Sequence, residues 1–335
     1  MAEPLPNRRP LLEVEHLRIE IPTRRGVLAA IDDVSFSIGE GEVLGLVGES
    51  GAGKSITGSA IIGLLEPPSH VAGGRIVFGG YRIDNRSPGE MRRIRGKEIG
   101  AIFQDPLTSL NPLYTVGQQL AETVRVHLGL DRGAARRRAI ALLQEVGIPA
   151  AAERVDHYPH QFSGGMRQRV VIALALAANP RLVIADEPTT ALDVSIQAQI
   201  IALLKRLTRE HAMAVLLVTH DMGVIAETAD RVAVMYAGRI AEIGPVHEVV
   251  KNPQHPYTAG LMGAIPAIGA RRDRLLQIDG AMPRLAAMPG GCPFHPRCPE
   301  VFAPCRSARP ELKPAGRSEA ACWLHDRATA GAVHG

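Results

Sequence analysis

Aromatic residues, cysteines and long apolar runs are all scarce in this sequence. Only 4% of its 335 residues are Phe, Trp or Tyr, and the four cysteines all lie from Cys292 onward. The longest apolar run worth testing, residues 170–178, falls far short of the ~20 residues that a membrane-spanning helix needs. Charged residues and two prolines precede any apolar stretch at the amino terminus, so no secretory signal is visible. These absences argue against a membrane-spanning protein and predict a cytoplasmic globular one.

An excess of one charge is also missing. The formal net charge of +4 is modest for this length, and an excess of Arg over Lys of 33 to 5 more often reflects GC-rich coding than a nucleic-acid surface. Two arginine clusters, residues 92–95 and 136–138, are interpreted as solvated helix faces, although contact with lipid headgroups, a partner or RNA stays open. We therefore expect no nucleic acid among the partners.

The clearest positive signal is residues 48–55, Gly-Glu-Ser-Gly-Ala-Gly-Lys-Ser, which fill every fixed position of the phosphate loop G-x-x-x-x-G-K-[ST]. Its glycines let successive N–H groups point at one anion, Lys54 adds charge and Ser55 supplies a magnesium ligand. A buried strand over residues 42–47 and a short helix over residues 56–65 are expected on either side. The loop predicts a nucleoside triphosphate with Mg²⁺, contacted by Gly48, Ser50, Gly51, Ala52, Gly53, Lys54 and Ser55.

Hydrophobic periodicity predicts the organisation of the chain. Alternating apolar residues indicate antiparallel strands over residues 12–21 and 27–38 and a hairpin near residues 75–80. Polar, Pro-punctuated sequence then holds helices over residues 116–128 and 134–146, which indicates an inserted helical subdomain at about 105–180. Strands over residues 182–185, 214–218 and 232–236 alternate with helices, which predicts an α/β fold with a mostly parallel sheet. From about residue 251 prolines are frequent and long periodic runs are fewer. This change predicts a boundary between a domain of residues 1–250 and an extension of residues 251–335.

Two adjacent carboxylates, Asp186 and Glu187, end an apolar strand. A strand that merely stops at a charged turn is common, but phosphoryl transfer needs one carboxylate to hold magnesium and a second to orient and deprotonate the attacking water. Neighbouring residues at a strand end point in different directions, so the two can divide these roles. Glu187 is the predicted catalytic base.

Ser163-Gly164-Gly165 lead into an apolar helix over residues 170–178. A serine N-cap, exposed glycine N–H groups and the positive end of the helix dipole would favour a phosphate, whereas in isolation the motif is at least as often a plain helix cap. Two phosphate sites can serve one γ-phosphate only if the second comes from another copy.

This arrangement resembles the ATP-binding-cassette (ABC) family, whose two nucleotide domains meet head to tail around ATP. The resemblance covers residues from about 11 to 250 and rests on six motifs in the family's order. They are the phosphate loop at residues 48–55, the Q-loop glutamine Gln104, the signature at residues 163–168, Asp186-Glu187, the D-loop Ala191-Leu192-Asp193 and the switch histidine His220. It implies a P-loop NTPase fold with a RecA-like core, an antiparallel β subdomain and a helical subdomain. It also implies ATPase activity.

The resemblance assigns roles to individual residues. Glu187, His220 and Gln104 would be catalytic, and Ser55, Gln104 and Asp186 would surround Mg²⁺. The nucleotide would also be contacted, in part across a dimer, by Ser163, Gly165, Gln168 and Asp193. One departure concerns adenine, because no aromatic residue lies between His16 and Ile31 to stack on the base. Arg24 or Arg25 could stack by its planar guanidinium instead.

Two further segments are similar to the ATP-binding subunits of oligopeptide and dipeptide importers, residues 103–112 and 252–258. That similarity implies coupling of ATP binding and hydrolysis to peptide uptake, at the cytoplasmic face of the cell membrane. The implied partners are a second, related ATPase chain, two transmembrane permeases and an extracytoplasmic peptide-binding protein. Because such partners usually select the cargo, nickel or another solute stays open. A soluble cassette ATPase acting on nucleic acid or ribosomes is the alternative from another class.

The cysteines look like one ligand set, although scattered free thiols are the simplest alternative and disulfides fit a cytosolic chain poorly. The set is Cys292, Cys298, Cys305 and Cys322. Their spacing contains no C-x₂-C pair and cannot choose the metal. Residues 291–299 resemble the carboxy-terminal extension of the same importer subunits, where a [4Fe–4S] cluster is known in some members. The resemblance therefore favours that cluster over structural Zn²⁺, with a metal-free tail third.

Overall fold

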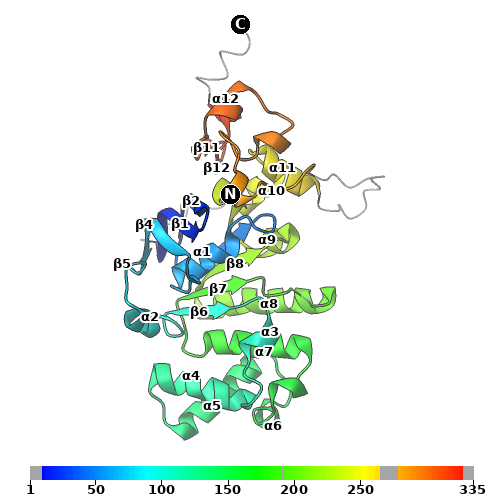
Figure 1. Ribbon diagram of the computed structural model, residues 1–335. Coiled ribbons are helices and arrows are strands. Elements are labelled where there is room, and N and C mark those ends of the chain that lie inside the picture. Colours follow the sequence, from blue (N-terminus) through cyan, green and yellow to red (C-terminus); the bar gives the residue numbers. More distant parts are fainter. Residues whose placement is uncertain (1–9, 191, 265–277, 327–335) are drawn as a thin grey trace. The chain divides into compact units, whose positions relative to one another are not determined.

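The computed structural model describes residues 10–190, 192–264 and 278–326 (Figure 1). They form two compact units. Among these residues, unit 1 holds 38–43 and 85–217, and unit 2 holds 10–37, 44–84 and 218–326. The domain boundary near residue 250 and the helical subdomain at about 105–180 stay predictions.

Unit 1 combines short parallel strands with most of the longer helices (Figure 1). The strands β6 (Ile99–Ile102) and β7 (Leu182–Asp186) pair in parallel, and β8 (Ala214–Thr219), whose last two residues belong to unit 2, is the neighbour of β7. The helices are α2 (Pro88–Ile94), α3 (Pro106–Ser109), α4 (Val116–Leu128), α5 (Arg132–Glu145), α6 (Ala151–Arg154), the 3₁₀ turn η1 (Pro159–Gln161), α7 (Gly164–Leu176) and α8 (Val194–His211).

Helices α4 and α5 form because their ends are capped. Thr115 and Gln118 make a reciprocal capping box at the start of α4, and Gly129 ends that helix in the left-handed region at φ 68°. Asp131 accepts from Ala134 N–H at the start of α5. Both helices contact α7, whose apolar side chains from Val170 onward are buried except for Leu174. The predicted helices over residues 116–128 and 134–146 are confirmed.

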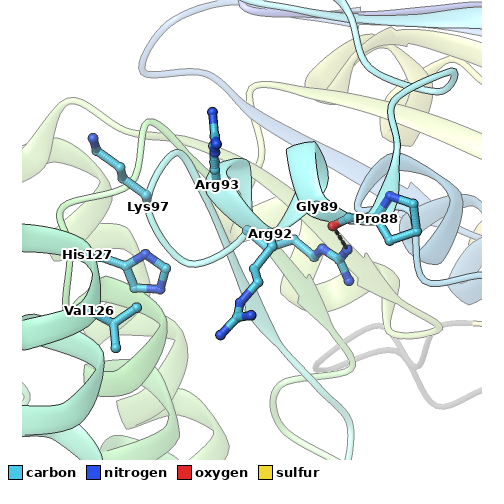
Figure 2. Close-up of a pocket in the computed structure, with 8 residues that line it drawn as sticks. Pro88, Gly89, Arg92, Arg93, Lys97, Val126 and His127 are labelled. Atoms are coloured by element: carbon cyan, nitrogen blue, oxygen red, sulfur yellow. Dashed lines mark hydrogen bonds between the residues drawn. The ribbon is translucent and has the colours of Figure 1, made fainter.

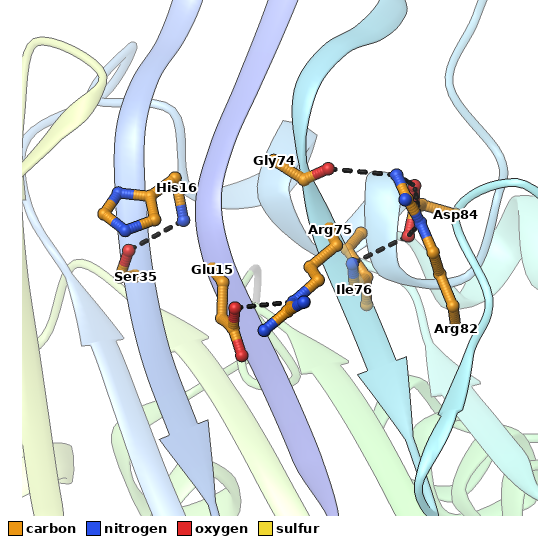
Figure 3. Close-up of polar contacts among 8 residues, drawn as sticks. All are labelled: Glu15, His16, Ser35, Gly74, Arg75, Ile76, Arg82 and Asp84. Atoms are coloured by element: carbon orange, nitrogen blue, oxygen red, sulfur yellow. Dashed lines mark hydrogen bonds and ion pairs between the residues drawn. The ribbon is translucent and has the colours of Figure 1, made fainter.

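Unit 2 begins with a four-stranded sheet of order β2-β1-β4-β5. Its strands are β1 (Leu12–Thr23), β2 (Gly26–Ile38), β4 (His70–Phe78) and β5 (Tyr81–Arg82). Polar pairs tie it together (Figure 3): Arg75 on β4 donates to Glu15 on β1 at 2.6 Å, and the Asp84 carboxylate accepts from Ile76 N–H at 2.8 Å and from Arg82. The predicted strands over residues 12–21 and 27–38 and the antiparallel hairpin are confirmed.

The second strand group of unit 2 positions the phosphate loop. Its order is β11-β12-β10-β9-β3, with β3 (Val43–Val47) parallel to β9 (Arg231–Tyr236) and β10 (Arg239–Pro245) antiparallel to β9. Helix α1 (Lys54–Ile61) follows β3 and is shorter than the predicted 56–65 because the chain turns at Gly63, φ 64°. Helix α9 (Met222–Thr228) precedes β9, and α10 (Val246–Lys251) follows β10.

The chain after α10 is built from short elements. They are α11 (Pro256–Gly263), the 3₁₀ turns η2 (Leu285–Ala287) and η3 (His295–Arg297), α12 (Ala303–Ser307), β11 (Lys313–Ala315), β12 (Ser318–Ala320) and η4 (Trp323–His325). β12 pairs antiparallel with β10, through Glu242 opposite Ala320 and Ile243 opposite Glu319. The segment therefore folds as part of unit 2 and extends its strand group.

Candidate active site

The phosphate loop connects β3 to α1 and has the backbone that its glycines permit. Gly48, Gly51 and Gly53 have φ of 152°, 82° and 107°, a region that other residues rarely adopt. A Cβ at Gly48 would lie 2.3 Å from Met235 O, so this position also excludes a side chain on steric grounds. The loop is a cradle of backbone N–H groups at a helix start, which suits a phosphate.

Lys54 lies within this cradle. Its side chain is 6% exposed, and Nζ donates to Gly48 O at 2.9 Å and Glu49 O at 3.1 Å. The ammonium is thus held against the loop that the sequence assigns to phosphates. Ser50, Gly51 and Ser55 are exposed, whereas Gly48 and Ala52 are buried. The exposed hydroxyl of Ser55 is a hard oxygen donor of the kind that Mg²⁺ prefers.

His220 follows β8 and also belongs to unit 2. It is exposed, and the backbone beside it is fixed by Asp221, whose N–H donates to Thr219 Oγ1 at 3.0 Å and whose carboxylate accepts from Gly223 N–H at 2.8 Å. A capped turn therefore presents the imidazole at the carboxyl end of a buried strand.

Glu187, in unit 1, is held by two side chains. Gln104 Nε2 donates to Glu187 Oε2 at 2.9 Å, and Thr190 Oγ1 donates to the same oxygen at 2.8 Å. Glu187 itself has φ 47°, a left-handed conformation that costs a non-glycine residue about 1–3 kcal/mol and that clusters at functional sites. The structure thus brings the predicted Q-loop glutamine and the predicted base together. Asp186, the residue before Glu187, ends β7 and is half-buried.

The predicted signature lies at the start of α7. Ser163 is the N-cap and accepts from Met166 N–H at 3.4 Å, while Gly164 remains exposed. A Cβ on Gly165 would lie 2.8 Å from Ile196 Cγ2, so close packing of α7 and α8 requires glycine. Gln168 differs from the rest, because it is 1% exposed and its buried Nε2 has no hydrogen-bond partner among the described residues.

The remaining predicted contacts are placed as follows. Asp193 is the exposed N-cap of α8 and makes no side-chain capping bond. Ala191, the first residue of the predicted D-loop, lies outside the described residues. Arg24 and Arg25 are exposed in the turn between β1 and β2, and their stacking on adenine stays a prediction. The site residues therefore fall into two groups, one in each unit.

Two residues to which the sequence assigned no role at the nucleotide contact the phosphate loop within unit 2. Arg297 makes a two-bond ion pair with Glu49, and Tyr257 Oη accepts from Glu49 N–H at 2.9 Å. Both come from the segment after residue 250, more than 200 positions along the chain. No local pattern signals a contact of this kind.

The four cysteines of unit 2 are free thiols. Cys292 N–H donates to Cys305 O at 2.9 Å, and burial, followed by the charges of neighbouring cysteines, raises the pKa of Cys292 to about 11. Burial likewise raises the pKa of Cys322 to about 11, with added repulsion from Cys292, Cys298 and Cys305. The thiols are thus close enough to influence one another. Within the described ranges, no three His, Cys, Asp or Glu side chains form a ready site for a single metal ion.

A basic cavity of about 700 Å³ lies in unit 1 (Figure 2). No carboxylate lines it, and its lining residues are Pro88, Gly89, Arg92, Arg93, Arg95, Lys97, Val126 and His127. Arg95 donates to Pro88 O at 3.5 Å, and burial together with Lys97 lowers the pKa of His127. The cavity collects one of the arginine clusters noted in the sequence, and none of the predicted nucleotide contacts lines it.

Exposed apolar side chains gather on residues 103–114, around and after Gln104. Phe103, Leu107, Leu113 and Tyr114 are 46%, 62%, 79% and 52% exposed. Large apolar groups that are close in sequence and exposed together are typical of an interaction surface. Among the described helices, none has the length and apolar composition that crossing a bilayer requires.

Comparison with known proteins gives matches to both halves of the chain. Residues 31–190 match the family described as "ABC transporter", and residues 241–305 match "Oligopeptide/dipeptide transporter, C-terminal region". Similar relatives include the dipeptide transport ATP-binding protein DppD of Bacillus subtilis, 48% identical over 96% of this chain and 97% of the relative. DppD of Escherichia coli is 47% identical over 90% and 92%.

Solved structures agree with these matches. The chain is similar to the cassette MJ0796 in a dimeric post-hydrolysis state bound to ADP and Pi, with a TM-score of 0.63 and 28% identity over 70% of this chain and 98% of that one. It is also similar to CbiO1 of Clostridium perfringens, part of the ABC transporter complex CbiONQ, with a TM-score of 0.63 and 30% identity over 73% and 92%. The fold is that of an ABC nucleotide-binding cassette.

Proposed function

Since the chain belongs to the ABC transporter family, we propose that it is the ATP-hydrolysing subunit of an importer for dipeptides or oligopeptides. One observation carries this function: a complete cassette and a tail of the oligopeptide/dipeptide type occur in one chain, which aligns almost end to end with dipeptide transport ATP-binding proteins. The cassette is an ATPase. The cargo follows from the relatives' names and is the part that experiment must test.

In the proposed reaction the chain's residues bind the triphosphate and prepare the attacking water. The phosphate loop and Lys54 hold the phosphates, and Mg²⁺, when bound near Ser55, Asp186 and Gln104, would neutralise phosphate charge. Glu187 orients the water and takes its proton. The hydrogen bonds that Gln104 and Thr190 donate to Oε2 hold the Glu187 carboxylate in one orientation for this step. His220 contacts the γ-phosphate.

A second ATPase chain completes the site in this proposal. Ser163, Gly165 and Asp193 would serve the nucleotide of the partner, and the structural relative MJ0796 is described as dimeric. Binding of ATP would close the pair and hydrolysis would reopen it, which requires about 5.5 kcal/mol of differential binding for a switch from 1:99 to 99:1. Gln168 is buried, so it would contact nucleotide only after a local rearrangement of α7.

The membrane partners are proposed from the apolar surface of residues 103–114. Its exposed apolar side chains, Phe103, Leu107, Leu113 and Tyr114, are suited to receive a cytoplasmic segment of a permease. The chain would then lie at the cytoplasmic face of the cell membrane with two permeases and a peptide-binding protein outside. Closing of the ATPase pair would be passed to the permeases through this surface.

The cysteine set is proposed to hold a [4Fe–4S] cluster, with Zn²⁺ as the alternative. Support comes from the donor set, because four free thiols lie in unit 2. Burial raises the pKa values of Cys292, Cys298 and Cys322, so a bound metal would be needed to deprotonate these three at neutral pH. Anaerobic purification followed by iron, sulfide and zinc analysis tests this. One zinc per chain without iron would overturn the cluster.

Peptide import is tested by isolating the chain from membranes and identifying what co-purifies. We expect permeases, a second ATPase chain and peptide-stimulated ATPase activity in proteoliposomes containing the peptide-binding protein. The matched variant Leu113→Asp should release the chain from permeases while leaving its basal ATPase rate unchanged. Stimulation by nickel rather than peptide would contradict the cargo. Tight, salt-sensitive RNA or DNA binding without permeases would overturn import altogether.

A further inference from the structure

Arg297 connects the cysteine segment to the phosphate loop. Nη1 donates to Glu49 Oε2 at 2.8 Å and Nη2 donates to Glu49 Oε1 at 2.9 Å, which is a bidentate pair. Glu49 occupies the first variable position of the loop pattern, so its side chain is free to serve as an anchor rather than a phosphate ligand. This pair therefore anchors the loop near its amino-terminal end, whereas α1 begins at its carboxy-terminal end.

The pair is well built, because the Arg297 side chain is only 6% exposed. Nε donates to Asp279 O at 2.9 Å, and the guanidinium lies 5.8 Å from the centre of the Tyr236 ring. A buried guanidinium is costly without a partner, so Glu49 is required in this position. Hydrogen bonding with Glu49 raises the pKa of Arg297 further above its usual value.

Two more residues of the segment contact the same loop. Tyr257 accepts from Glu49 N–H, and Met282 Cε lies 3.1 Å from the position that a Cβ on Gly51 would take. Phe294 packs against Tyr257 with ring centres 5.4 Å apart. The loop backbone is therefore supported by side chains from α11 and from the described residues 278–297.

Arg297 is also fixed by the cysteine segment itself. It ends the turn η3, and the next residue is Cys298. Five positions before Arg297, Cys292 pairs its N–H with Cys305 O. The backbone that carries the guanidinium is therefore continuous with the backbone that carries these cysteines.

We propose that Arg297 is a positioning residue for the phosphate loop, which makes nucleotide affinity depend on the folded state of the cysteine segment. The ligands of the nucleotide itself are unchanged in this scheme, and only the order of the loop that carries them varies. The inference rests on ATP binding at residues 48–55 and on neither the peptide cargo nor the identity of a metal.

Nucleotide affinity of the full-length chain tests the proposal, measured as the Kd for ATP with Mg²⁺ by fluorescence of a labelled ATP analogue. Arg297→Gln should weaken binding about tenfold or more, since a charge-assisted pair is lost, while kcat at saturating ATP changes little. Arg317→Gln is the matched control, because it removes an exposed arginine of the same segment that pairs with Glu248. A Kd within twofold of wild type in R297Q, or an equal loss in R317Q, would overturn the proposal.

Glu49→Gln keeps the test decisive if R297Q fails to fold, because this change lies in the loop and leaves the cysteine segment intact. It should weaken ATP binding to a similar degree, and the E49Q/R297Q double variant should bind no worse than either single one. Fluorescence of Trp323, the only tryptophan, reports whether the segment stays folded. Additive losses in the double variant would show that the two side chains act separately and would contradict the proposal.

Cys298→Ser tests the dependence on the cysteine segment. We expect C298S to raise the Kd for ATP when Arg297 is present and to add nothing in the R297Q background. An unchanged Kd in C298S, or an equal further loss in the C298S/R297Q double variant, would refute the transmission through Arg297.

Discussion

Acid should destabilise unit 2 through one buried histidine. His255 is 4% exposed, and its Nδ1 accepts from Tyr257 N–H at 3.0 Å as the N-cap of α11. Burial, reinforced by the charge of His325, lowers the pKa of His255 to about 4. The neutral ring is therefore required in the folded protein, because a protonated Nδ1 cannot accept the capping bond.

The magnitude follows from the two pKa values. An unfolded histidine titrates near pH ~6.5, whereas folded His255 takes its proton only near pH 4, so the unfolded chain binds more protons in between. The free energy of unfolding therefore falls as pH falls from about 6.5 to about 4. At 1.36 kcal/mol per pKa unit, the full loss is ~3 kcal/mol.

Urea unfolding followed by Trp323 fluorescence measures this loss, since the only tryptophan lies in the same unit and donates to Ala308 O at 2.9 Å. The comparison is wild type against His255→Asn, whose side-chain oxygen can cap α11 without titrating. Between pH 7.5 and 4.5 the wild type should lose ~2–3 kcal/mol more than the variant. His247→Asn, at a histidine whose side chain is 61% exposed, should behave like wild type. Equal pH dependence in wild type and H255N would refute the argument.

Three further outcomes are expected. Glu187→Gln should lower the ATPase rate by a factor of ~10² to 10⁴ in a phosphate-release assay while ATP binding persists, and an undiminished rate would exclude Glu187 as the base. Thr190→Val, which removes one bond to that carboxylate, should slow the same assay less than Glu187→Gln does, and the reverse order would contradict the role given to Gln104 and Thr190 in orienting it. Gly45→Ala should cost about 1–3 kcal/mol in thermal or urea unfolding, because the new Cβ would lie 2.6 Å from Ile225 Cδ1, and unchanged stability would show that the core yields there.

The sequence predicted those helices and strands whose ends are determined by residues close by in the chain, such as caps and turn glycines. Helix α4 matches the expected residues 116–128 because a capping box starts it and Gly129 ends it. The hairpin of β4 and β5 likewise follows from Gly79-Gly80. The three-residue strands β11 and β12 were missed, since so short a segment has no measurable alternation, and their pairing depends on β10 rather than on their own sequence.

The site was predictable in composition but not in its internal contacts. The residue types of the phosphate loop and of Asp186-Glu187 follow from the chemistry of phosphate and magnesium. The bond between Gln104 and Glu187 joins positions 83 apart, and no spacing rule places two such side chains together. Gln168 shows the opposite case, since a motif position expected to contact nucleotide is buried. The anchor of Glu49 on Arg297 depends on long-range folding and was invisible in the sequence.

The strand β12 has a consequence for anyone who shortens this chain. It covers the outer side of β10, so a protein ending before β11 would leave the backbone N–H and C=O groups of β10 without their partner strand. An uncovered strand edge is a template for pairing with another copy. Removal of the tail to obtain a minimal cassette should therefore yield a protein that self-associates through β10. Insolubility of such a fragment would reflect an open sheet edge rather than a damaged ATP site.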